Sequence, residues 1–238
     1  MKKLLTLAVA LLTLTACNST KTYTVNGTFD IPATFQMGDT VIERGPITGY
    51  IYMAGLDNQT FDSVLVTNEK FTFTGPIDPK QPYFVYLVSE YGAGMIALEA
   101  GEIEVTIGEA MTATGTPIND EIDNMMAWVD SVGYMLADEM EKMGQDGPLT
   151  EETFVPVYTR YSDMVNQHID SIYQANDQNL IGVYCANVKT AQARSSAEME
   201  EMLAPMSDYV KNSELIQQHI VYLRQVESQP DGEDYIGN

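Results

Sequence analysis

The sequence predicts an α+β protein in two parts, an antiparallel β-sandwich or open barrel followed by a helical bundle. In the first part, residues 23–110, short runs of alternating apolar and polar residues are separated by Gly, Pro, Asn and Asp. After Pro117 the apolar residues recur every three or four positions instead. Alternation gives a strand one apolar side, whereas the longer period gives a helix one apolar face.

The first part is expected to form a β-domain over residues 23–114. Its candidate strands are rich in aromatic and β-branched residues, which favour strands. They cover residues 23–29, 48–54, 61–66, 70–75, 83–88, 94–99 and 102–107. Thr67-Asn68-Glu69 is a gap of hairpin size between two of them, and the prolines at 32, 46, 76, 79 and 82 lie between runs, where proline is tolerated.

The second part, residues 115–228, is expected to be helical. The predicted helices cover residues 118–143, 149–173, 179–193, 195–203 and 213–226. Pro117 and Gly144 suit the two ends of the first helix. Residues 229–238 are read as a polar tail.

The N-terminus reads as a secretory signal peptide over residues 1–16. Lys2 and Lys3 precede an apolar run that is shorter than the roughly 20 residues needed to span a bilayer. The run ends in Leu14-Thr15-Ala16-Cys17, which resembles the bacterial lipobox. The resemblance implies cleavage before Cys17 and a lipid anchor on its sulfur, with residues 17–22 as a tether. The alternatives are an ordinary signal peptide with a chance cysteine and a buried apolar helix.

The tether also bears on location. It has no aspartate directly after Cys17 and no acidic run. We therefore expect an outer-membrane anchor that faces the periplasm.

The chain is strongly acidic, with a net charge of −22. Removing residues 1–16 leaves 10 basic against 34 acidic residues, a net charge of −24. Nucleic acids and anionic lipids bind through Lys and Arg, so this composition argues against both as partners. Solubility explains the acidity most simply. Calcium binding is the alternative, although the chain has no EF-hand loop.

Residues with obvious chemistry are few. With Cys17 lipidated, Cys185 cannot form an internal disulfide, and its apolar surroundings indicate a core thiol rather than a nucleophile. His168 and His219 have no partner at metal-ligand spacing and are expected on helix surfaces. We therefore expect no catalytic residue, no metal site and no cofactor.

Aromatic residues are concentrated in the β part. The candidate interaction surface consists of Tyr50, Tyr52, Tyr83, Tyr86 and Tyr91. Tyrosine suits an interface because it presents an apolar ring with a polar tip. The competing interpretation is that these side chains fill the core and form cross-strand pairs.

Four short motifs resemble a β-domain of unknown function. They are Val25-Asn26-Gly27, Asp62-Ser63-Val64 with residues 70–75, Leu98-Glu99-Ala100-Gly101, and Thr114-Gly115-Thr116 with Asn119. That domain precedes a thioredoxin-like module (the TlpA, ResA and AhpC/TSA group) in Bacteroidota lipoproteins. The helical stretch that follows it there often carries a pattern similar to residues 179–184.

The family's activity resides in the Cys-x-x-Cys pair of its thioredoxin module. This chain has no such pair, so the resemblance does not assign disulfide exchange to it. It implies instead an accessory role beside a separate thioredoxin-like protein.

Three functions follow from these observations. The favoured one is a non-enzymatic binding or interaction lipoprotein of the envelope. The second is an accessory or recruiting subunit for a separate thiol:disulfide oxidoreductase. The third is a hydrolase whose residues show no motif.

Overall fold

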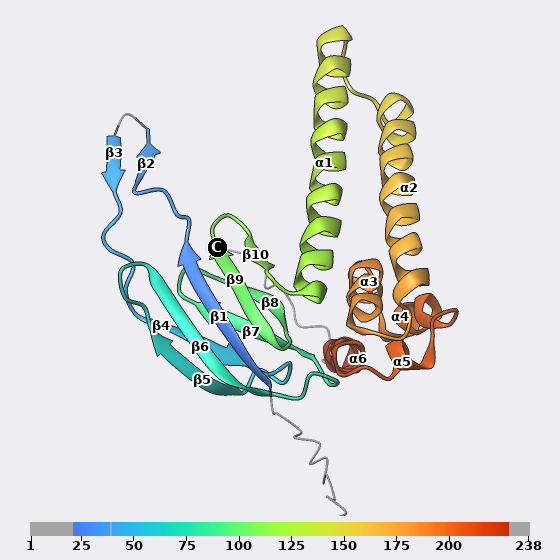
Figure 1. Ribbon diagram of the computed structural model, residues 1–238. Helices are drawn as coiled ribbons and strands as arrows, with labels where there is room; N and C mark the ends of the chain where they lie inside the picture. Colours follow the sequence, from blue (N-terminus) through green and yellow to red (C-terminus); the bar gives the residue numbers. More distant parts are fainter. Residues whose placement is uncertain (1–20, 39, 229–238) are drawn as a thin grey trace, which may run out of the picture.

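A computed structural model describes residues 21–38 and 40–228. It confirms the α+β fold in two parts, with a β-domain followed by helices (Figure 1). The predicted signal peptide, Cys17 and the polar tail lie outside the described residues.

The β-domain is a sandwich of two four-stranded sheets. In the first sheet the strand order is β10 (Met111–Thr114), β9 (Gly101–Ile107), β1 (Lys21–Phe29) and β6 (Lys70–Ile77). In the second it is β5 (Thr60–Leu65), β4 (Tyr50–Ala54), β7 (Tyr83–Ser89) and β8 (Gly92–Leu98). The strands pair antiparallel, as expected, except β1 and β9, which pair in parallel and make the first sheet a mixed one.

Each of the seven predicted strands differs from the observed one by one or two residues at one or both ends, and two of these differences affect the fold. β1 begins at Lys21, because Lys21 and Thr22 pair with Ile77 and Pro76 of a long β6. Two residues of the predicted tether are therefore part of the sandwich. Pro76 lies inside β6 rather than between strands, which is tolerated because β6 is the edge of its sheet.

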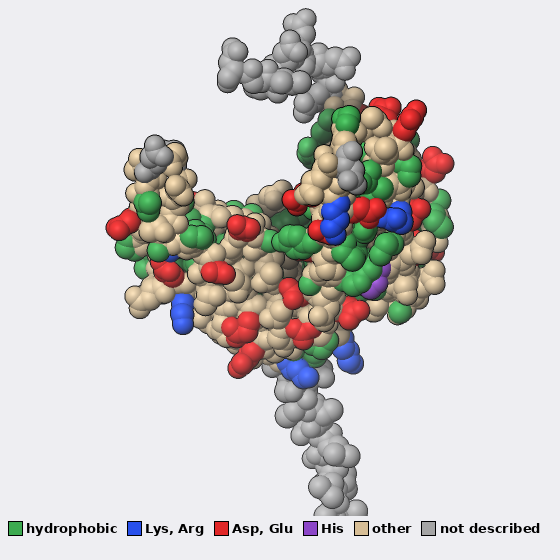
Figure 2. Space-filling model, turned by 90° about the horizontal axis from the view of Figure 1, so that it is seen from above, with side chains coloured by type: hydrophobic (Ala, Val, Ile, Leu, Met, Phe, Trp, Pro, Cys, Tyr) green, Lys and Arg blue, Asp and Glu red, His purple; other side chains and the backbone are tan. Residues whose placement is uncertain are grey.

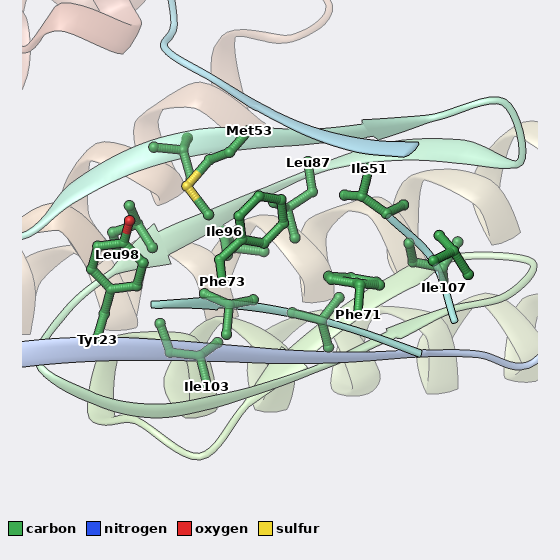
Figure 3. Close-up of a cluster of buried hydrophobic side chains, with 14 of the residues drawn as sticks. Tyr23, Ile51, Met53, Phe71, Phe73, Leu87, Ile96, Leu98, Ile103 and Ile107 are labelled. Atoms are coloured by element: carbon green, nitrogen blue, oxygen red, sulfur yellow. The ribbon is translucent and has the colours of Figure 1, made fainter. Parts of the chain in front are cut away.

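The core lies between the two sheets, where inward side chains of every long strand meet (Figure 3). Val25, Phe73 and Ile103 of the first sheet face Ile51 and Leu87 of the second, and all are almost fully buried. Alternation along each strand turns the intervening residues outward. The sandwich thus has two outer faces, and their chemistry differs.

Three short strands escaped prediction on the β side: β10, at the edge of the first sheet, and two that lie outside both sheets. β2 (Thr34–Met37) and β3 (Thr40–Glu43) form a separate hairpin that projects from the sandwich (Figure 1). At its base the Arg44 guanidinium donates to the carbonyls of Pro32, Ile31 and Gly45 and to the Glu69 carboxylate. An isolated hairpin is marginally stable, so this arginine fixes where the hairpin leaves the domain.

The helical part begins with a long hairpin of α1 (Pro117–Asp146) and α2 (Glu151–Asn176). The remaining helices are α3 (Leu180–Thr190), α4 (Ser196–Leu203), α5 (Asp208–Lys211) and α6 (Glu214–Ser228). The α1–α2 hairpin projects in the same direction as the β2–β3 hairpin (Figure 1). Seen from above, the molecule is hollowed between these two hairpins (Figure 2). No helix among the described residues is long and apolar enough to cross a bilayer.

The helices cover part of one outer sheet face. Phe84 and Ala97 project from β7 and β8 into a cluster with apolar residues of α3, α4 and α6. The rings of Phe84 and Tyr184 lie 6.2 Å apart across this joint. The two parts therefore share a buried apolar interface rather than a flexible linker.

Candidate interaction surface

The part of this sheet face that the helices leave open is aromatic. Tyr50 and Tyr52 alternate with buried Ile51 and Met53, so both point outward from β4. Register places Tyr50 opposite Leu65 and Tyr52 opposite Val88, and Phe61 shares the outward side of β5. We call Tyr50, Tyr52, Phe61, Leu65 and Val88 the aromatic face; their exposed fractions range from 38 to 57 %.

No charged side chain lies at the outward positions of β4, β5 and β7. Two acids lie beside the ends of the aromatic face: Glu90 reaches Gly49, next to Tyr50, and Asp57 lies in the turn that follows β4. In a chain with a net charge of −22, an uncharged apolar patch bordered by acids is a local exception to the composition. Apolar centres with polar rims are typical of protein interfaces.

The other outer face of the sandwich is polar. Its outward positions on β1 are Thr22, Thr24, Asn26 and Thr28, and those on β6 and β9 are again mostly Thr, Lys and Glu. The Asn26 amide nitrogen donates to Glu104 at 3.0 Å, and the Thr72 hydroxyl donates to the Asn26 oxygen at 3.2 Å. Both faces have the same pleat and similar exposure, so β-sheet geometry alone does not require aromatic residues on one of them.

The predicted tyrosine surface is thus only partly assembled. The rings of Tyr50 and Tyr52 lie 6.2 Å apart on the aromatic face, and Tyr86 points to the same side, half-buried beside the helices. Tyr83 is in register with inward-facing Leu98 and lies at the sandwich edge. Tyr91 packs on Phe29 with ring centroids 5.7 Å apart, in the turn between β7 and β8.

Sequence reasoning missed Phe61, Leu65 and Val88 as members of this face. The signal for the first two was present, because Phe61, Ser63 and Leu65 alternate along one strand. Which neighbouring strands bring them next to Tyr50 and Tyr52 depends on pairing between distant segments, which periodicity does not show.

The motif residues of the β-domain have structural roles. Gly27 lies under the Phe71 ring, whose atoms come within 2.4 Å of where a Cβ would be, so any side chain there would displace the ring. The Glu99 carboxylate accepts from the backbone N–H groups of Ile118 at 2.8 Å and Asn119 at 3.3 Å, which caps the start of α1. Gly27 thus serves packing inside the sandwich and Glu99 joins the two parts, and neither motif forms a reactive site.

The helical motif is also structural. The Asn179 side chain caps α3 by accepting from Ile181 N–H at 2.8 Å. Gly182 allows α3 to approach the end of α2, since a Cβ there would be 2.2 Å from the Asn176 carbonyl oxygen. Tyr184, two residues on, forms the ring contact with Phe84 described above.

The cysteine and the two histidines of the described part of the chain do not come together in one site. Cys185 is fully buried, and its sulfur lies 3.8 Å from the Met125 sulfur. Burial raises the pKa of the Cys185 thiol to about 12, which opposes formation of the nucleophilic thiolate. His168 stacks on Trp128 with centroids 3.9 Å apart, and His219 lies on α6, far along the chain from it.

On the face seen in Figure 2 the acidic side chains are spread over the surface. Within residues 21–38 and 40–228, no group of three or more His, Cys, Asp or Glu could hold a metal ion. One ionic group lies on the α1–α2 hairpin, where Glu139 accepts from Tyr161 at 2.8 Å and pairs with Arg160. Those hydrogen bonds, first the one from Arg160, lower the pKa of Glu139. This group ties the two helices together.

Comparison with known proteins supports two features of the chain. Residues 23–122 match the family model described as a domain of unknown function (DUF4369), which covers less than half of the chain. Residues 1–18 match the model of the prokaryotic membrane lipoprotein lipid attachment site. No curated protein and no solved structure matches the chain. The chain therefore combines this β-domain with a lipid attachment site, as a lipid-anchored protein of the cell envelope.

Proposed function

We propose that this lipoprotein is an interaction module without catalysis of its own, and that its aromatic face binds another protein of the envelope. The observation that carries the proposal is the contrast between the two outer faces of one sandwich. One is covered by hydrogen-bonded Thr, Asn and Glu side chains, and the other exposes Tyr50, Tyr52 and Phe61. Exposing apolar surface to water costs free energy that a partner would recover.

The aromatic face continues an interface that the chain already makes. On the same side of the same sheet, Phe84 and Ala97 are covered by the chain's own helices. The part of this sheet face that stays open also carries apolar side chains and no charge. It is therefore suited to contact an apolar surface of a second protein. Aromatic residues are enriched in protein interfaces, and Tyr is among the residues that contribute most to binding free energy there.

Electrostatics favours a partner with basic residues around its apolar centre. Glu90 and Asp57 border the aromatic face, and the whole chain is strongly acidic. A second copy would bring another −22 charges, and an anionic lipid surface would be repelled in the same way. We further propose that the protein faces the periplasm from the outer membrane, because its tether has no aspartate after Cys17.

The proposal is tested by crosslinking in cells, followed by recovery of the protein through a tag. Three forms are compared: the wild type, a Tyr50→Ser/Tyr52→Ser variant, and Tyr134→Ser, which removes a 78 % exposed tyrosine from α1. The same envelope proteins should be recovered with the wild type and with Tyr134→Ser, and lost with the double variant.

Recovery of an unchanged set with the double variant would contradict the proposal, provided that its melting temperature matches the wild type. A thioredoxin-like protein within the lost set would identify the role as that of an accessory to an oxidoreductase. Other envelope proteins in the lost set would support a separate interaction module.

A further inference from the structure

Next to the aromatic face lies a cavity of about 340 Å³ that the proposed protein contact does not use. It is open to solvent on one side and is lined by the turn after β4, by strand β7 and by helices α3 and α6. Leu56 and Leu215 form its apolar part, and both are buried in the joint between sheet and helices. The cavity is therefore built on rigid elements, as ligand sites commonly are.

The rest of the lining is polar and consists of amide, imidazole and phenol groups. Three carboxamides (Asn58, Asn187 and Gln218), the imidazole of His219 and the phenols of Tyr86 and Tyr222 complete it. Lys, Arg, Asp and Glu are all missing from this lining. The cavity thus combines two aromatic rings with a group of neutral hydrogen-bond donors and acceptors.

Some of these polar groups have hydrogen-bonding capacity to spare. The side chains of Asn187 and His219 make no hydrogen bond to another described residue. The Gln218 amide nitrogen donates to Glu214 at 3.2 Å, which leaves its carbonyl oxygen available. The described part of the chain therefore does not use the Asn187 amide, the His219 imidazole or the Gln218 carbonyl oxygen for hydrogen bonds of its own.

We propose that this cavity binds a neutral carbohydrate. A sugar ring offers an apolar C–H face, which packs on a tyrosine ring, and hydroxyl groups, which pair with amides and imidazole. An anionic ligand would find no cation in the lining and a net charge of −22 around it. A divalent metal would find one imidazole and no carboxylate.

The test is calorimetric titration of the mature lipoprotein, held in a detergent without a sugar head group. The probes are four neutral disaccharides (maltose, cellobiose, lactose and N,N′-diacetylchitobiose) and, as the charged comparison, digalacturonic acid. At least one neutral disaccharide should bind saturably and more tightly than digalacturonic acid.

Two variants localise the binding. Tyr222→Ala removes a 61 % exposed ring, and Asn187→Asp changes an amide to a carboxylate of nearly the same shape. Each should weaken binding about fivefold to tenfold, the effect of one lost hydrogen bond or ring contact. Tyr209→Ala, which removes a 44 % exposed ring from α5 outside the cavity, is the matched control and should change nothing.

Three results would overturn the proposal: no saturable binding of any neutral disaccharide, binding that neither cavity variant weakens, or tighter binding of digalacturonic acid. The Tyr50→Ser/Tyr52→Ser variant separates this proposal from that of the protein contact. It should lose the envelope partner and keep the sugar, so either proposal can fail alone.

Discussion

Asn119, in the first turn of α1, holds the backbone of Ala97 on strand β8 with both ends of its carboxamide. Its oxygen accepts from the Ala97 N–H at 3.0 Å, and its nitrogen donates to the Ala97 carbonyl at 2.8 Å and to the Thr116 hydroxyl at 2.8 Å. Both Asn119 and Thr116 are 2 % exposed. This pairing fixes how the helical part is placed on the sheet, and so which half of the outer face stays open.

Asn119→Ala should therefore destabilise the protein by about 2 kcal/mol or more, because it leaves the buried N–H and C=O of Ala97 without partners. The measurement is urea unfolding followed by circular dichroism. Asn124→Ala, at an exposed position one turn further along α1, is the control and should change the free energy of unfolding by less than about 0.5 kcal/mol. Equal effects of the two substitutions would show that the pairing is not a main contact.

Gly27→Ala should also be destabilising, by about 1–3 kcal/mol, since the new methyl group would overlap the Phe71 ring. Gly133→Ala is the matched substitution in α1, where no atom lies within 4 Å of the added carbon. It should stabilise by up to about 1 kcal/mol, because alanine favours helix. Combining Gly27→Ala with Phe71→Leu should recover part of the loss, and strict additivity of the two would argue against the ring contact.

Arg44→Met should loosen the β2–β3 hairpin without unfolding the sandwich. The substitution removes the four hydrogen bonds at the base of the hairpin, including the one to Glu69. Hydrogen exchange measured by mass spectrometry should become faster across residues 31–45 and stay unchanged in β7 and β9. Arg194→Met, at an exposed arginine, is the control. Unchanged exchange in residues 31–45 would show that the hairpin is held by other contacts.

Cys185 should be inert in the folded protein. Because burial raises its pKa to about 12, the thiol stays protonated at pH 8.5, and iodoacetamide should modify it only after urea unfolds the chain. A cysteine placed at exposed Thr72 should react within minutes under the same conditions. Rapid modification of Cys185 in the native state would mean that α3 opens readily.

The raised pKa of Cys185 also makes the free energy of unfolding depend on pH in alkaline solution. The unfolded thiol ionises near 9.0, whereas the folded one does so near 12. The contribution of Cys185 to stability is therefore complete below pH 9 and is lost as the pH rises from there toward 12. Cys185→Ala should flatten this part of the stability profile, measured by urea unfolding at stepwise pH; an unchanged slope would contradict the assignment.

Much of the fold could be predicted because its signals are local. The strand β9, for example, alternates without a break, and α1 begins at Pro117 as the sequence indicates. The gap at Thr67-Asn68-Glu69 is a tight turn, with positive φ at Asn68 and Glu69 and paired backbone groups of Thr67 and Lys70. The expected hairpin is wrong, however, because β5 and β6 lie in different sheets and the turn links those sheets. The strands β2, β3 and β10 are four residues each, too short for periodicity to identify.

The aromatic face could be predicted only in part, because it is a property of strand pairing. Tyr50 and Tyr52 are neighbours on one strand, so their common side follows from alternation. Tyr83 falls on the other side because its register matches that of Leu98. The parallel pairing of β1 with β9, which brings residues nearly eighty positions apart together, leaves no local pattern in the sequence.

Site-specific photocrosslinking tests the central claim most directly. p-Benzoylphenylalanine replaces Tyr52 on the aromatic face in one strain and Thr24 on the polar face in the other, so the two probes report from opposite sides of one sandwich. The account predicts a recurrent adduct of one envelope protein from position 52 and none of that protein from position 24. Adducts from both positions alike, or from position 24 alone, would contradict the assignment of the aromatic face as the interaction surface.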